Sequence, residues 1–121
     1  MIAILDYGMG NLRSVLRAVT HVGGDAEITG DAGTVAAADA LIVPGVGHFG
    51  ACMRNLRGRS LAEPVSAFAA TRRPVLGVCL GMQVLFDSSE EQGPCRGAAY
   101  KRAIPKRSLL LLIARLLFLI R

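Results

Sequence analysis

The chain alternates short, largely apolar runs with stretches in which apolar residues recur every three or four positions. A short apolar run bounded by turn residues is typical of a buried strand. This pattern predicts strands over residues 2–5, 26–29, 40–43 and 75–78, with Pro44-Gly45 ending the third strand.

Apolar residues at helical spacing predict helices in three places. The first helix follows the N-cap residue Asn11 and ends near Gly23-Gly24; its apolar stripe is Leu12, Val15, Leu16 and Val19. The second helix ends before Arg72-Arg73-Pro74, where charge and proline break the pattern; its stripe is Leu61, Val65, Phe68 and Ala69. The third is predicted over residues 80–86, followed by a polar loop over residues 87–93.

Strands that alternate with helices predict an α/β fold. We expect a mostly parallel sheet with helices on both faces, incomplete at its C-terminal end. Sites in such folds lie at the carboxyl ends of the strands. Three motifs lie at such ends here, beginning at Gly8, Pro44 and Gly77.

Composition and charge divide the chain in two. Its 121 residues are 52% hydrophobic with no Trp, which suits one small-residue core. The formal charge is +5, yet residues 1–97 hold eight Lys or Arg against nine Asp or Glu. Residues 98–121 hold six basic residues and no acid. We therefore expect a near-neutral domain over residues 1–97, no nucleic-acid partner, and an atypical basic and apolar tail over residues 98–121.

The cysteines and the two ends of the sequence exclude further classes. Cys52, Cys79 and Cys95 are odd in number and lack metal-ligand or disulfide-framework spacing, so we expect no metal and a cytoplasmic protein. The N-terminus does not resemble a signal peptide. The apolar stretch 109–120 is 12 residues long and contains Arg115, whereas a membrane span needs about 20 residues, so membrane association is not expected.

The strongest chemical signal is Gly77-Val78-Cys79-Leu80-Gly81. This is the spacing of a nucleophile elbow, with a thiol in place of the serine hydroxyl. The tight turn favours glycine two residues before and two residues after the nucleophile. The elbow places Cys79 at a helix N-terminus, which favours the reactive thiolate, and aims the N–H of Leu80 at a developing oxyanion. A buried apolar role is the alternative for Cys79, and it is the role expected of Cys52 and Cys95.

The segment Pro44-Gly45-Val46-Gly47 follows the third strand. Alone it is an ordinary turn. Together with the elbow it predicts the second half of an oxyanion hole, because the tetrahedral intermediate of acyl transfer needs two donors. His48 is a weak candidate for a base, since a base there would crowd those donors. The segment Gly8-Met9-Gly10 begins like a dinucleotide motif, but Arg13 replaces the third glycine, so no nucleotide cofactor is expected.

With these motifs, residues 1–97 resemble the class I glutamine amidotransferases. Two segments make the resemblance more specific: the opening Asp6-Tyr7-Gly8-Met9-Gly10-Asn11, and Gly81-Met82-Gln83 after the cysteine. They are similar to the glutaminase subunits of imidazole glycerol phosphate synthase in histidine biosynthesis.

The resemblance implies a substrate, roles and a partner. Cys79 would attack the side-chain amide of glutamine, form a thioester and release ammonia. Leu80 and the Val46-Gly47 stretch would supply oxyanion donors, and Gly45 and Gln83 would line the glutamine pocket. The ammonia would pass to a separate (β/α)₈ barrel cyclase subunit. No cofactor is implied.

The sequence departs from this family after residue 97. Members complete the site with a histidine base and a glutamate near their C-terminus, and residues 98–121 contain neither. We therefore expect little glutaminase activity from this polypeptide. A noncatalytic docking subunit and a different cysteine hydrolase are the alternatives. The abrupt change of composition suggests an out-of-frame tail, a hypothesis that fails if no other reading frame of the DNA beyond Gly97 encodes a family-like continuation.

Overall fold

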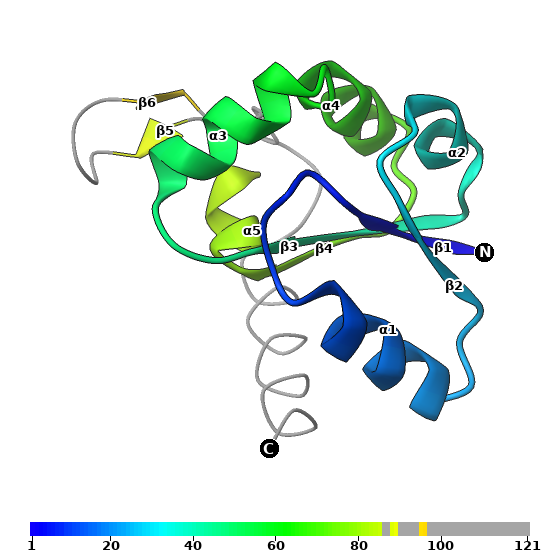
Figure 1. Cartoon of the computed structure of the whole chain (residues 1–121). Coiled ribbons are helices and arrows are strands. Elements are labelled where there is room, and N and C mark those ends of the chain that lie inside the picture. Colours follow the sequence, from blue (N-terminus) through cyan, green and yellow to red (C-terminus); the bar gives the residue numbers. More distant parts are fainter. Residues whose placement is uncertain (86–87, 90–94, 97–121) are drawn as a thin grey trace.

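The computed structural model of the protein describes residues 1–85, 88–89 and 95–96 (Figure 1). The polar loop and tail predicted beyond residue 85 lie outside this part, apart from two short strands. The elements in chain order are β1 (Ile2–Leu5), α1 (Leu12–His21), β2 (Ala26–Thr29), α2 (Ala32–Ala37), β3 (Ala40–Gly45), α3 (Phe49–Gly58), α4 (Ala62–Ala70), β4 (Val75–Cys79), α5 (Leu80–Val84), β5 (Ser88–Ser89) and β6 (Cys95–Arg96).

Four strands form one parallel sheet in the order β2-β1-β3-β4. β1 pairs with β2 from Ile2 opposite Ala26, and β3 pairs with β4 from Leu41 opposite Val75. Their carboxyl ends therefore lie along one edge of the sheet. The short strands β5 and β6 form a separate antiparallel pair.

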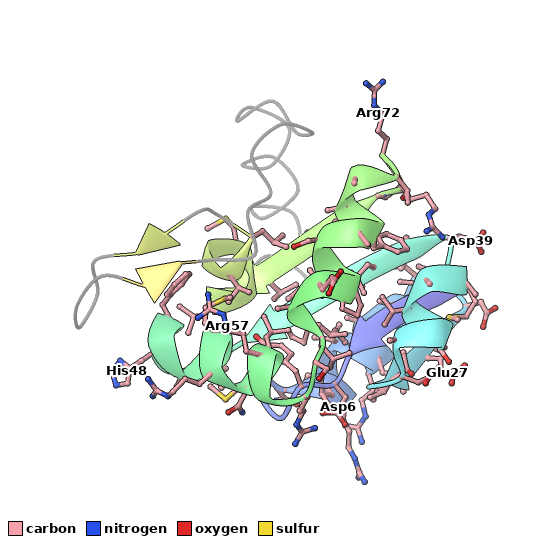
Figure 2. All side chains as sticks on the ribbon, turned by 90° about the horizontal axis from the view of Figure 1, so that it is seen from above. Asp6, Glu27, Asp39, His48, Arg57 and Arg72 are labelled. Carbon is pink, nitrogen blue, oxygen red and sulfur yellow. The ribbon has the colours of Figure 1, made fainter. Side chains whose placement is uncertain are left out.

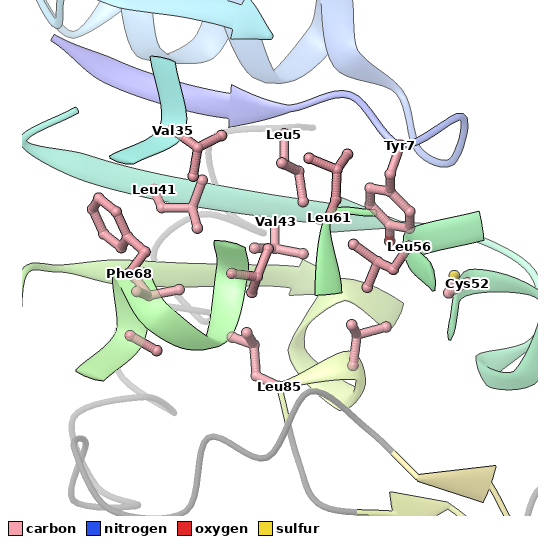
Figure 3. Packing of buried hydrophobic residues seen from close by; sticks show 14 of the residues in the cluster. Leu5, Tyr7, Val35, Leu41, Val43, Cys52, Leu56, Leu61, Phe68 and Leu85 are labelled. Carbon is pink, nitrogen blue, oxygen red and sulfur yellow. The ribbon is translucent and has the colours of Figure 1, made fainter. Parts of the chain in front are cut away.

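Helices cover both faces of the sheet, as the sequence predicts (Figure 1). On one face α1 buries Val15 against Ile4 and Ile42 of the central strands. On the other face α2, α3 and α4 enclose a larger core, in which Leu41, Val43 and Phe68 are at most 1% exposed (Figure 3). The α/β fold class is thus confirmed over the described residues.

Charged and polar side chains lie around the outside of these layers (Figure 2). Glu27, Asp39 and Arg72 are exposed, and the carboxylate of Asp39 pairs with the N-terminal amine. Burying apolar residues and leaving ionised groups in water is the favourable arrangement for both. No helix in the described part of the chain is long and apolar enough to cross a membrane.

The predicted strands and the first helix agree with the structure in place and type. α1 begins where the N-cap was predicted: the side-chain oxygen of Asn11 accepts a hydrogen bond from the Ser14 N–H at 3.3 Å. This bond satisfies one of the helix's unpaired N-terminal donors. α4 and α5 also follow the predicted spacing, and α5 ends at Val84 within the described residues.

Two predictions about boundaries are wrong. Pro44-Gly45 does not end the third strand, because β3 continues through both residues and pairs Gly45 with Cys79 of β4. The β1 pairing with β3 stops at Ile42, so the N–H that Pro44 lacks leaves no ladder bond unmade on that side. Ser88–Ser89 form a strand rather than part of a loop.

Two helices were not predicted. α2 has six residues and is capped by Asp31, whose carboxylate accepts from the Thr34 N–H at 2.7 Å. Such a short helix leaves little periodicity to detect. α3 buries Phe49, Cys52, Met53 and Leu56, which do follow helical spacing.

Candidate functional site

Cys79 is the last residue of β4 and directly precedes α5. Its backbone φ is +55°, a left-handed conformation that costs a residue other than glycine free energy. Its side chain is exposed. The structure therefore holds this thiol at a strained strand-to-helix turn, open to solvent.

The two glycines around Cys79 are required by space. A Cβ on Gly81 would lie 1.8 Å from the carbonyl oxygen of Val43, and a Cβ on Gly77 would lie 2.4 Å from the Cα of Met82. Both distances are far below van der Waals contact, and both neighbouring atoms belong to the backbone. A side chain at either position would push α5 away from the sheet.

The end of β3 lies beside the elbow. Gly45 pairs with Cys79 in the sheet register, and a Cβ on Gly45 would lie 2.6 Å from the Gly81 nitrogen. Val46 is 53% exposed, and Gly47 has φ +85°. The segment predicted to supply oxyanion donors therefore adjoins the thiol across neighbouring strands.

Two buried side chains support this segment from within the core (Figure 3). The Tyr7 hydroxyl donates to the Pro44 carbonyl at 2.5 Å. The Cys52 thiol donates to the Val46 carbonyl at 3.6 Å. Burial, together with the neighbouring Cys52 thiol, raises the pKa of the Tyr7 hydroxyl far above its usual range. Burial also raises the pKa of the Cys52 thiol, against a smaller opposing effect of the neighbouring Tyr7 hydroxyl and of the hydrogen bond to Val46.

The structure thus brings together the predicted residues Gly45, Cys79 and Leu80, with Val46 and Gly47 next to them. Gln83 lies on α5, and its side chain is outside the described part. His48 is exposed at the start of α3 (Figure 2). Cys52 is buried in α3, as expected.

Sequence reasoning missed the contacts that Tyr7 and Cys52 make with this segment. The signal available for Tyr7 was its place two residues beyond the end of β1, at the sheet edge where sites gather. The signal for Cys52 was the helical spacing of α3, which turns it toward the core. Within the described residues, no three His, Cys, Asp or Glu side chains gather as metal ligands would.

This arrangement suits attack by a thiol on an acyl group. The thiol is exposed, Leu80 follows it at the start of α5, Gly45 of β3 pairs with it, and the backbone around it is closely packed. The family model of glutamine amidotransferase class-I matches residues 3–106 of the chain. The chain belongs to this family.

Three similar curated relatives share one name. Imidazole glycerol phosphate synthase subunit HisH of Rhodopirellula baltica is 52% identical over 97 residues, which are 80% of this chain and 47% of that protein. The subunit of the same name from Sulfurimonas denitrificans gives the same identity and coverage. That from Bacillus cereus is 45% identical over 97 residues, covering 80% of this chain and 46% of the relative. The chain spans about half the length of these relatives.

Proposed function

We propose that this chain is part of a glutaminase subunit, which hydrolyses glutamine to glutamate and ammonia. The observation that carries the proposal is the strained, exposed Cys79 paired in register with Gly45. A left-handed backbone at a residue with a side chain is kept only where the surrounding structure enforces it, and such positions cluster at active sites. Membership of the amidotransferase family gives glutamine as the amide.

In the proposed reaction, the Cys79 thiolate attacks the side-chain carbonyl carbon of glutamine. A C–S bond forms, and the carbonyl oxygen becomes an oxyanion held by the N–H of Leu80 and the N–H groups of the Val46-Gly47 stretch. The C–N bond then breaks, and the nitrogen leaves as ammonia after taking from solvent the proton that the Cys79 thiol released on ionising. Water hydrolyses the thioester to glutamate and restores the thiol. Gly45 and Gln83 line the glutamine pocket in this proposal.

The names of the relatives support a more specific role. Each is a subunit of imidazole glycerol phosphate synthase. We propose that ammonia formed at Cys79 passes to a cyclase subunit with a (β/α)₈ barrel, as part of cytoplasmic histidine biosynthesis in a heterodimer. Residues 1–97 form the amidotransferase part in this proposal, with residues 98–121 as a separate segment.

Labelling with a glutamine-like diazoketone tests the glutamine site. The reagent should alkylate Cys79 in the full chain, and excess glutamine should slow the reaction. Peptide mapping by mass spectrometry locates the adduct. The buried Cys52 is the internal control and should stay unmodified. If Cys79 reacts with iodoacetamide but not with the diazoketone, the glutamine pocket is wrong and a different cysteine hydrolase is indicated.

A further inference from the structure

Tyr7 and Cys52 reach the same short segment from two different elements. Tyr7 follows β1 and Cys52 lies in α3, and both side chains are 0% exposed. Their hydrogen bonds end on the carbonyls of Pro44 and Val46, two residues apart at the end of β3. The proposed reaction uses neither side chain as a reacting group.

A hydrogen bond that fixes the direction of a carbonyl also fixes the N–H group of the same peptide unit. The peptide bond is planar and trans, so the N–H of Gly45 points opposite to the Pro44 carbonyl, and the N–H of Gly47 opposite to the Val46 carbonyl. The segment has little other restraint at its tip, because Val46 is exposed and Gly47 adopts φ +85°, a region glycine enters freely. The Cys52 thiol therefore orients the 46–47 peptide unit, and the Tyr7 hydroxyl adds a restraint to the 44–45 unit, which the pairing of Gly45 with Cys79 also holds.

Both donors keep their protons over a wide pH range. Burial raises the pKa of Tyr7 and of Cys52, so each remains neutral and able to donate where a surface group would begin to ionise. A buried donor that loses its acceptor is costly, which favours the observed direction of both carbonyls.

We propose that Tyr7 and Cys52 are positioning residues for the oxyanion hole. Cys52 fixes the 46–47 peptide unit, which carries the Gly47 donor, and Tyr7 anchors the Pro44 carbonyl at the end of β3, from which the donor segment extends. This inference rests on the proposed function, since it needs Cys79 to attack a carbonyl carbon. It assigns Tyr7 and Cys52 an effect on the tetrahedral intermediate and none on the reactivity of the thiol itself.

Acylation and alkylation of Cys79 separate these two effects. Acylation by γ-glutamyl p-nitroanilide passes through an oxyanion and expels p-nitroaniline, whose burst is followed by absorbance and whose thioester is located by mass spectrometry. Alkylation by iodoacetamide forms no oxyanion, because iodide leaves from a saturated carbon. Each reaction is measured on the full chain for the wild type, Tyr7→Phe, Cys52→Ala and Cys52→Ser.

We expect Tyr7→Phe and Cys52→Ala each to slow acylation about 10-fold while alkylation stays within about 2-fold of the wild type. Cys52→Ser restores a donor and should bring acylation back to within about 3-fold. Equal acylation in all four proteins overturns the inference, and so does a parallel loss of both reactions. If the wild type is alkylated but neither acylated by the anilide nor labelled by the diazoketone, the proposed function fails instead.

Discussion

At the scale of the residue, Cys79 combines strain with exposure. A left-handed backbone at a residue with a Cβ costs about 1–3 kcal/mol, and the packing of α5 on the sheet must offset this cost. The side chain itself is exposed and gains little from burial. Under the proposed function, this position supports the chemistry at the expense of stability.

Glycine and alanine at position 79 measure this strain. We expect Cys79→Gly to be more stable than Cys79→Ala by about 1 kcal/mol, the reverse of the usual order, because glycine adopts φ +55° without a steric penalty. Urea unfolding followed by circular dichroism gives the difference. Both variants should lose diazoketone labelling. Equal stabilities, or a more stable alanine variant, would mean that the turn is not strained.

Cys79 was predictable from sequence because its signal is local. Glycines two residues away on each side report the tight turn directly. The hydrogen bond of the Tyr7 hydroxyl was not predictable, since its acceptor carbonyl lies 37 residues further along the chain. Only the register of β1 and β3 brings these two residues together.

At the scale of the element, β3, β4 and α5 behave as one packed unit. Backbone approaches backbone where Gly81 meets Val43 and Gly77 meets Met82, so the helix lies directly on the strands. The sequence predicted the four strands as short, largely apolar runs and α5 as the helix that follows Cys79. It could not predict that β3 continues past Pro44, because the strand's extension depends on pairing with β4.

Adding one methyl group at position 81 of this unit should destabilise the protein strongly. We expect Gly81→Ala to lower the free energy of unfolding by about 3 kcal/mol, because the new Cβ would meet the Val43 carbonyl oxygen at 1.8 Å and the backbone must move. Gly58→Ala is the matched control. No heavy atom outside its own helix backbone lies within 4 Å of a Cβ there, so alanine should be neutral or stabilising by about 0.5–1 kcal/mol. Urea unfolding of both variants makes the comparison, and similar losses would contradict it.

At the scale of the whole molecule, the core on the α3 side contains an ionisable group that cannot ionise without cost. Tyr7 is fully buried and its pKa is raised. An unfolded tyrosine releases its proton near pH 10, while the native one retains it. The stabilising contribution of Tyr7 is therefore complete below that pH and decreases as the pH rises above it.

Alkaline unfolding of the wild type and of Tyr7→Phe should show this linkage. Between pH 10 and pH 11 we expect the wild type to lose about 1 kcal/mol more stability than the variant, because only the wild type releases the Tyr7 proton on unfolding. Other titrating groups are common to both proteins and cancel in the difference. Parallel curves from urea titrations at each pH would show that Tyr7 ionises equally in both states.

The close contacts at Gly77 and Gly81 mean that these two glycines indicate shared ancestry but do not by themselves indicate activity. These glycines are demanded by the space between a strand and a helix, so a descendant that no longer carried a thiol would still be selected to retain them for as long as it folded. Their presence in a genome is therefore a marker of architecture. A survey of which lineages retain glutaminase activity should therefore record whether a cysteine lies between the two glycines. The glycines alone indicate only that the fold was inherited.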